Sequence, residues 1–219
     1  MGKEINLLKN YPKSKRDLNK RLENKTKENI ELARSFGKEF FDGSRSTGYG
    51  GFNYNPKYWE KVIPDFIDFY NLNNNSKILD VGCAKGFMLF DFKKYLPNSF
   101  LKGIDISEYA IENGLDEIKE NLTVADARSL PFDDDSFDLV ISITTVHNFE
   151  REECIKSIKE IERVSNKNSF IVVDAYGNEE EKKAMFSWNL TAKTILHKNE
   201  WIDLFKEARY TGDYYWFLP

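Results

Sequence analysis

The sequence predicts a doubly wound α/β fold with a mainly parallel sheet of six or seven strands. From residue 77 onwards, short apolar runs alternate with segments of helical periodicity, which favours a parallel sheet covered by helices on both faces. Hydrophobic residues make up 41% of the 219 residues and aromatic residues 15%, which is enough for a sizeable core. The first predicted strand, 77–82, ends in a glycine-rich turn that opens a helix, and nucleotide-like ligands bind at such turns.

Residues 1–76 are predicted to form a helical cap and a lid, within the same domain as the 77–219 core. Helical periodicity extends over 17–41, with interruptions near 24–29. The residues expected on the buried face of this segment are Ile30, Ala33 and Phe40.

A glycine-rich and aromatic stretch, Arg45–Tyr54, separates this helical segment from the next. Such a composition excludes a regular helix and is typical of a loop that closes over a ligand. Helical spacing resumes over 56–71, where Pro64 predicts a kink.

The core is predicted to continue as alternating strands and helices. Strands are expected near 77–82, 99–104, 121–125, 137–143 and 168–174, and helices near 86–95, 107–113, 151–164 and 198–208. Residues 211–219 are enough for one more strand, so either the sheet has six strands or another segment fills the seventh position. We expect the insertion at 178–196 to carry elements specific to the substrate.

The glycine spacing after the first strand distinguishes between cofactors. A dinucleotide fingerprint would need glycines at positions 84 and 87, where the chain has Ala84 and Phe87. Instead, an acid stands two residues before Gly82 and a second glycine, Gly86, stands four residues after it. This arrangement resembles motif I of class I S-adenosylmethionine-dependent methyltransferases.

Three further segments, within residues 75–175, strengthen the resemblance. Asp105 ends the second strand, where a carboxylate can accept both hydroxyls of a ribose, and Ile106 offers an apolar face for adenine. Asp126 and the following alanine match the segment that meets the adenine amino group in this family. The run ending at Ser142 resembles its fourth strand.

The resemblance implies S-adenosylmethionine as cofactor and S-adenosylhomocysteine as product. Tyr49, in the lid, is expected over the methionine end of the cofactor. The residues expected to bind the cofactor are Asp80, Gly82, Cys83, Ala84, Gly86, Asp105, Ile106, Asp126, Ala127, Ser142, Ile143 and Tyr49.

The sequence lacks the motifs that mark several variants of the family. No Asp/Asn-Pro-Pro-aromatic motif follows the fourth strand, and Cys154 is not preceded by the proline of cytosine C5 enzymes. No acid follows that strand before Glu150, which argues against the metal-dependent catechol type and against aminopropyl transferases. The remaining resemblance is to the small-molecule group called methyltransferase type 11, with no metal expected.

The candidate catalytic residues are His147, Asp174 and Tyr176. His147 lies just beyond the fourth strand, and a histidine suits proton removal near neutral pH, although packing of the following turn is an equal alternative. Asp174 and Tyr176 end the fifth strand and face the same crevice, where structural hydrogen bonding is equally compatible. Arg45 and Trp188 are the candidate substrate-binding residues, for an anionic group and for an aromatic wall.

Charge and composition set the expectations for partners. The net charge of −4 argues against a nucleic-acid-binding protein, yet residues 1–39 carry eleven Lys/Arg and six Asp/Glu. We predict methyl transfer to oxygen or nitrogen of a small polar metabolite, such as a sugar or sugar nucleotide. The alternatives are an RNA or protein methyltransferase that docks through residues 1–39, and a non-catalytic cofactor-binding partner subunit.

Two cysteines, a polar start and no run of eighteen apolar residues lead us to expect a cytoplasmic protein without a membrane segment.

Overall fold

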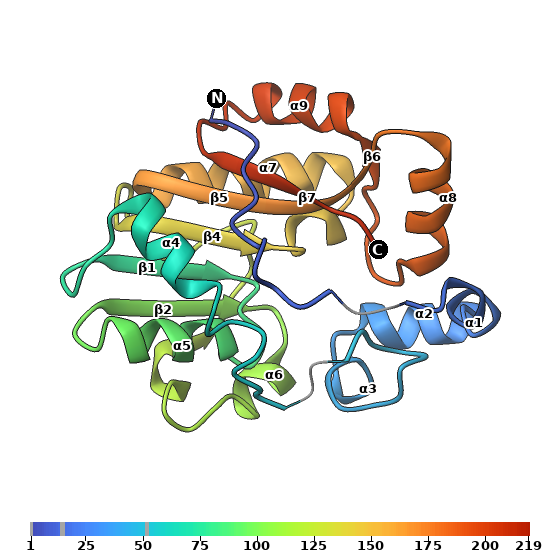
Figure 1. The fold of residues 1–219 in the computed structure, drawn as a ribbon, viewed down its shortest axis with the longest axis horizontal. Helices are drawn as coiled ribbons and strands as arrows, with labels where there is room; N and C mark the ends of the chain where they lie inside the picture. The colour runs from blue at the N-terminus through green and yellow to red at the C-terminus, as the bar shows by residue number, and fades with distance from the viewer. Residues whose placement is uncertain (1, 14–15, 51–52) are drawn as a thin grey trace.

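The computed structural model describes residues 2–13, 16–50 and 53–219. Its sheet has seven strands in the order β3-β2-β1-β4-β5-β6, with β7 also paired to β5, and every pairing is parallel (Figure 1). The doubly wound parallel sheet is confirmed. The strands are β1 (Lys77–Val81), β2 (Phe100–Asp105), β3 (Leu122–Val124), β4 (Phe137–Ile143), β5 (Ser165–Tyr176), β6 (Leu196–His197) and β7 (Asp213–Phe217).

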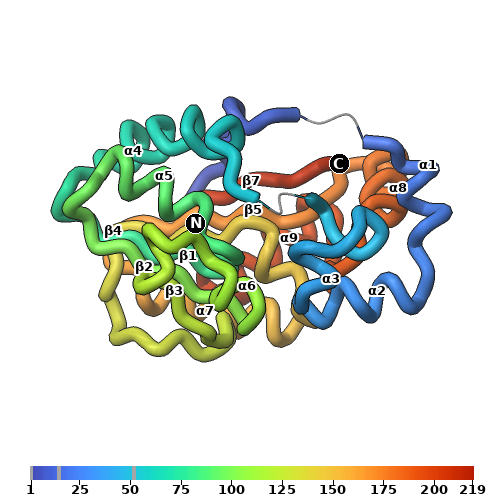
Figure 2. The backbone as a smooth tube through the Cα atoms, turned by 90° about the horizontal axis from the view of Figure 1, so that it is seen from below, coloured from blue at the N-terminus to red at the C-terminus, as the bar shows by residue number. Residues whose placement is uncertain are grey.

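Helices cover both faces of the sheet, as Figure 2 shows. On one face lie α4 (Ile63–Tyr70) and α5 (Phe87–Tyr95), and on the other lie α7 (Arg151–Val164) and α9 (Lys198–Glu207). The isoleucines of α7 recur at a helical spacing and bury one stripe of that helix against the sheet. Shorter elements complete the core: α6 (Glu108–Glu112), η1 (Lys119–Asn121) and η2 (Val146–Asn148).

The N-terminal segment lies along β7 at the edge of the sheet. The amide of Ile5 donates to the carbonyl of Tyr214 at 2.9 Å, and the amide of Tyr214 donates to the carbonyl of Lys3 at 3.1 Å. The first residues therefore pair with the edge that β7 would otherwise expose, and Figure 1 shows them beside that strand. The strand that the sequence analysis did not locate is the short β6, which lies beside the end of β5.

The predicted helix over 17–41 is three short helices: α1 (Leu18–Glu23), α2 (Lys27–Arg34) and α3 (Lys38–Phe41). Asp17 and Thr26 each cap a new N-terminus by accepting a hydrogen bond from a backbone amide three residues later. Phe36 adopts a positive φ of 50° just before α3, which also interrupts the helical path. Of the expected buried face, Ala33 is fully buried while Ile30 and Phe40 are half-buried.

The predicted kink at Pro64 is wrong. Residues 56–62 form turns, and Pro64 lies in the first turn of α4. Proline fits there because the first amides of a helix have no intrahelical partner. A further helix, α8 (Glu179–Trp188), occupies the insertion after β5.

Helices α1, α2 and α3 lie together with α8 beyond the carboxyl ends of the strands (Figure 1). They cover the end of the sheet where the predicted site residues gather. The division of the chain at residue 76 stays a prediction. Within the described ranges, no helix combines the length and the apolar character needed to cross a membrane.

Candidate active site

The turn after β1 has the backbone geometry of a tight ligand-binding loop. Three of its residues have positive φ: Gly82 at 86°, Ala84 at 50° and Gly86 at 79°. The amides of Gly82 and Cys83 both donate to the carbonyl of Ile104, at 2.8 and 2.9 Å, which ties the turn to the end of β2. A Cβ atom on Gly82 would lie 2.0 Å from Oγ1 of Thr145, so only glycine fits this position.

Asp105 joins the ends of β1 and β2. Its carboxylate accepts a hydrogen bond from the amide of Ala84 at 2.8 Å and another from the amide of Ser107 at 2.9 Å. Burial raises the pKa of Asp105, and these backbone hydrogen bonds oppose that effect. The next residue, Ile106, is 51% exposed and offers an apolar surface beside the carboxylate.

Asp80 is buried one residue before the end of β1. Burial, together with the nearby Asp105, raises the pKa of Asp80 to about 7. Asp80 therefore holds a proton in the folded protein up to near neutral pH. Cys83 lies beside these two carboxyl groups, and burial raises the pKa of its thiol, which makes it a packing residue rather than a nucleophile.

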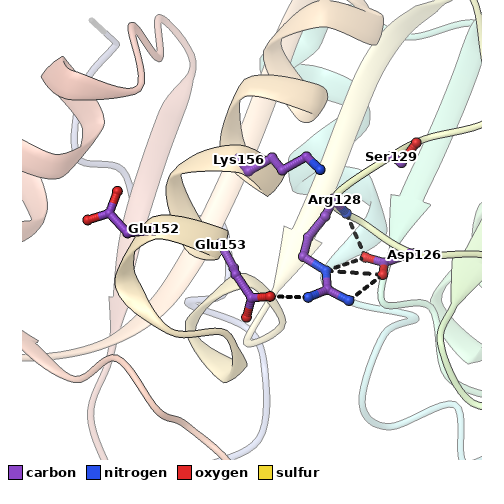
Figure 3. Close-up of a pocket in the computed structure, with 6 residues that line it drawn as sticks. All are labelled: Asp126, Arg128, Ser129, Glu152, Glu153 and Lys156. Atoms are coloured by element: carbon purple, nitrogen blue, oxygen red, sulfur yellow. Dashed lines mark hydrogen bonds and ion pairs between the residues drawn. The ribbon is translucent and has the colours of Figure 1, made fainter.

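Asp126 lies in a polar hollow of about 420 Å³ and is bound by Arg128 (Figure 3). Nε of Arg128 donates to both carboxylate oxygens at 3.0 Å, and Nη2 donates at 2.6 Å. Glu153 accepts from the same guanidinium, which lies 5.0 Å from the ring of Phe149. The hydrogen bonds from Arg128 lower the pKa of Asp126. Ala127, between the two, is buried.

Figure 3 shows Arg128 between Asp126 and Glu153, with Lys156 directed toward this group and Glu152 directed away from it. The sequence analysis missed Arg128, although a basic residue two positions after the acid is visible in the sequence. An adenine amino group would compete with Arg128 for Asp126.

The N-terminal helices are tied to the turn after β1. Nζ of Lys85 lies 2.6 and 2.8 Å from the two carboxylate oxygens of Asp42, and the hydroxyl of Tyr109 donates to Asp42 at 2.6 Å. The hydroxyl of Ser107 donates to the carbonyl of Phe36 at 2.5 Å. The cap therefore contacts both loops that flank the predicted cofactor position.

The end of β5 holds a second, buried polar group. The amide of Asp174 donates to Nδ1 of His147 at 2.8 Å, so the neutral imidazole carries its proton on Nε2. Burial lowers the pKa of His147 and raises that of Asp174. Asn189 donates to the Asp174 carboxylate, and the indole of Trp201 donates to its carbonyl at 2.9 Å.

The structure thus places His147 and Asp174 in one hydrogen-bonded cluster. Tyr176 lies further along β5 and packs edge-on against His197 at 5.7 Å. The end of β4 lies beside this cluster: Ser142 is fully buried, with no hydrogen-bond partner for its hydroxyl among the described residues, and Ile143 is half-buried.

The lid meets the segment after α8. The hydroxyl of Tyr49 accepts hydrogen bonds from the amides of Leu190 at 2.6 Å and Thr191 at 3.3 Å, and its ring lies 5.7 Å from that of Trp188. Nη1 of Arg45 donates to the carbonyl of Tyr49 at 2.9 Å. Tyr49 of the lid therefore contacts both Arg45 and Trp188, whereas residues 51–52 of the predicted lid lie outside the described part of the chain.

Residues 72–210, more than half of the chain, match the methyltransferase domain family. The chain belongs to the class I S-adenosylmethionine-dependent methyltransferases. It is therefore an enzyme of this family, with S-adenosylmethionine as its cofactor.

Known relatives differ in what they act on. The chain is 34% identical over 150 residues to a tRNA (carboxymethyluridine(34)-5-O)-methyltransferase of Arabidopsis thaliana. The matched segment covers 66% of this chain and 34% of the relative. The chain is 27% identical over 132 residues to a malonyl-[acyl-carrier protein] O-methyltransferase of Legionella pneumophila, covering 58% of this chain and 45% of the relative. The chain thus spans between a third and a half of these curated relatives.

Among solved structures, the chain resembles the methyltransferase in the complex with the Trm112 methyltransferase activator of Haloferax volcanii. The TM-score is 0.53 at 20% identity, over 68% of this chain and 71% of that one. At this identity the likeness concerns the fold.

The residues present fit S-adenosylmethionine at the ribose end of the site. The Asp105 carboxylate is fixed beside the glycine turn by two backbone amides. A carboxylate held in this way matches a cofactor that presents two vicinal hydroxyls. At the adenine end, Ile106 is exposed and Asp126 is engaged by Arg128.

Proposed function

We propose that this methyltransferase transfers a methyl group to oxygen or nitrogen of a small polar metabolite bound between the end of β5 and the cap. The observation that carries the proposal is the contact of Tyr49 with Leu190 and Thr191, which closes the lid over this end of the sheet. An acceptor held beneath such a lid would be a small molecule rather than a folded polymer. A sugar or sugar nucleotide would match the polar and aromatic lining formed by Tyr49, Arg45 and Trp188.

The reaction asks little of the protein beyond alignment. When bound, the cofactor supplies a methyl group on a sulfonium, which is already an activated electrophile. The residues of this chain would then hold the acceptor in line and exclude water, and orientation of this kind can contribute about 7–11 kcal/mol in favourable cases. The lid of Tyr49 and the wall of Trp188 are the candidates for both tasks.

We propose a positioning role for His147 and Asp174. Nδ1 of His147 already accepts a hydrogen bond from the Asp174 amide, and the Asp174 carboxylate accepts one from Asn189. A base needs a free lone pair that faces the acceptor. Tyr176, which is not part of this cluster, remains the candidate for direct contact with an acceptor.

Transfer to RNA or protein is the second candidate, because one relative is named as a tRNA methyltransferase. That candidate needs the basic residues 1–39 to face a polyanion. Several of them already have partners within the protein: Arg21 is buried, the exposed Lys9 pairs with Asp65 at 3.0 Å, and the exposed Arg34 donates to the carbonyl of Ala192 at 3.3 Å. This arrangement favours the small-molecule proposal.

The test is an acceptor screen with the full chain and S-adenosylmethionine, read as S-adenosylhomocysteine formation by mass spectrometry. The panel contains sugars, sugar nucleotides, small acids and amines, bulk tRNA and a protein extract. Turnover confined to small molecules is the expected result. Turnover of tRNA or protein alone would overturn the proposal, and cofactor binding without any turnover would support a non-catalytic subunit. Asp105→Ala, which loses the ribose ligand, is the negative control.

A further inference from the structure

Two arginines of the cap, Arg16 and Arg21, lie against the ring of Trp188, and a third, Arg45, lies next to Arg21, which donates a hydrogen bond to its carbonyl. The guanidinium carbons of Arg16 and Arg21 lie 4.9 and 4.5 Å from the Trp188 ring. Arg16 also lies 4.8 Å from the ring of Phe217, and Arg21 lies 5.2 Å from that of Tyr49. Arg45 completes the group, which we name the arginine cluster: Arg16, Arg21 and Arg45.

Within the described residues, the hydrogen bonds that these guanidinium groups donate all go to neutral backbone carbonyls. Arg21 donates to the carbonyls of Arg45 and Gly48 at 2.7 and 3.0 Å. Arg16 donates to Leu218 at 3.2 Å, and Arg45 donates to Tyr49 at 2.9 Å. Nowhere in the described ranges does a carboxylate lie within 4.0 Å of any of the three arginines.

One donor of the cluster is buried without a partner. Nε of Arg16 has no hydrogen-bond acceptor among residues 2–13, 16–50 and 53–219, although the atom is shielded from solvent. A buried donor without an acceptor is uncommon because its desolvation is not compensated. Arg21 is buried and Arg45 is exposed, so the cluster extends from the interior to the surface of the cap.

The cluster carries positive charge that its surroundings do not neutralise. Burial lowers the pKa values of Arg16 and Arg21, and the neighbouring Arg45 lowers both further. The acid that faces Arg16 is Asp174, whose carboxylate is already bound by Asn189 and lies 3.6 Å from His147. Like charges held together in a partly dry site are unfavourable unless an anion joins them.

We propose that the arginine cluster binds an anionic group of the methyl acceptor, a carboxylate or a phosphate. This inference rests on the proposed function and gives it a substrate class. A guanidinium offers a planar fork of donors that matches carboxylate and phosphate oxygens, and the rings of Trp188 and Tyr49 hold the guanidinium groups of the cluster in place by stacking. The strands β4 and β5 lie between β1, which leads into the glycine turn, and β7, which carries the Phe217 ring next to Arg16. This order leaves the cofactor and the anion in separate places.

Binding of small anions to the full-length chain tests the inference without a known acceptor. The probes are malonate, acetate and inorganic phosphate at constant ionic strength, titrated in thermal-shift and calorimetric experiments. The variants are Arg16→Gln and Arg45→Gln, each compared with Arg209→Gln, which removes one exposed positive charge outside the cluster. S-adenosylmethionine affinity is measured on every variant as a check of folding.

We expect saturable binding of at least one probe, weakened at least tenfold, or about 1.4 kcal/mol, in Arg16→Gln and Arg45→Gln and less than twofold in Arg209→Gln. A preference for malonate and acetate would assign a carboxylate, and a preference for phosphate would assign a phosphorylated acceptor. Equal affinities in all four proteins, or no binding of any probe, would overturn the inference.

The anion-binding test and the acceptor screen can fail independently of each other. If the acceptor screen finds only neutral or cationic small molecules, the arginine cluster inference fails while the proposed function stands. If tRNA alone is methylated, the proposed function fails, and anion binding lost in the two cluster variants would then describe a phosphate contact. For an anionic acceptor, Arg45→Gln should raise KM at least tenfold and change kcat less than threefold.

Discussion

The two halves of the site are built differently. On the cofactor side, the turn after β1 is fixed by hydrogen bonds to the end of the neighbouring strand, such as the one from the Ala84 amide to the Asp105 carboxylate, 21 residues away. On the acceptor side, the Tyr49 hydroxyl accepts from the amide of Leu190, 141 residues away. The first half is part of the sheet, whereas the second exists only once the cap has packed on α8.

This difference explains which half tolerates change. Adjacent parallel strands place the ends of β1 and β2 together in every molecule of this fold, so the cofactor position is a property of the architecture. The acceptor position depends on side chains of α1, the lid and the segment after α8. Substitutions there should alter the acceptor half while cofactor binding persists, and the four predictions below test that separation.

The largest effect is expected for Gly82→Ala. Its Cβ would lie 2.0 Å from Thr145 Oγ1 at a φ of 86°, so steric overlap and backbone strain together should cost about 3 kcal/mol of folding free energy. Chemical denaturation measures the loss. Gly37→Ala is the matched control, because its nearest neighbour is 3.6 Å away, and it should change stability by less than about 0.5 kcal/mol. Equal effects at the two glycines would contradict the assignment of a closed turn.

Asp105→Ala should weaken S-adenosylmethionine about 100-fold, since hydrogen bonds to a charged group contribute about 1.5–3 kcal/mol each. Calorimetric titration measures the affinity, and NAD is expected not to bind to either protein. Asp203→Ala, an exposed acid paired with Lys206, should leave the affinity unchanged. Retained tight binding of S-adenosylmethionine in Asp105→Ala would show that this carboxylate does not bind the ribose.

Asp80→Asn tests the buried acid pair through pH. Because the pKa of Asp80 is raised to about 7, the folded protein holds a proton between about pH 4 and 7 that the unfolded chain releases. Stability contributed by this group therefore falls as pH rises through that interval. The variant should gain about 2–3 kcal/mol relative to the wild type when pH rises from 5 to 8, because about two pKa units are crossed at about 1.4 kcal/mol each.

His147 acts in the opposite direction, because burial lowers its pKa and its contribution is lost as pH falls below about 6.5. Both proteins contain His147, so its contribution cancels when the free energy of unfolding of Asp80→Asn is compared with that of the wild type. A difference that does not depend on pH would mean that Asp80 is ionised in the folded protein throughout the range.

The smallest effect is expected for Tyr49→Phe. It removes the acceptor of the Leu190 and Thr191 amides and should cost about 1 kcal/mol. Hydrogen exchange should increase in the lid and in residues 189–192, while S-adenosylmethionine affinity changes less than twofold. Tyr58→Phe, whose hydroxyl has no hydrogen bond within the described residues, is the control. A large loss of cofactor affinity in Tyr49→Phe would contradict the independence of the cofactor side and the acceptor side of the site.

Much of the fold was predictable because it rests on local patterns. The spacing of Ile155, Ile158 and Ile161 predicted α7 with its bounds, and the apolar run before Gly82 predicted β1. Pro64 was misread because a proline in the first turn of a helix and one inside a helix look alike in sequence. Helix α8 was missed within the insertion, where three glutamates begin a segment with little apolar periodicity.

The sequence by itself determined the alternation of strands and helices from β1 to β5, the glycine turn and the acid at the end of β2, because each depends on residues close together in the chain. Only the tertiary structure decided that Arg128 binds Asp126, that the N-terminal segment pairs with β7 and that Arg16 and Arg21 meet at Trp188. These contacts join side chains or edges from separate elements. Their partners are chosen by how the elements pack, and no periodicity or spacing in the sequence encodes that choice.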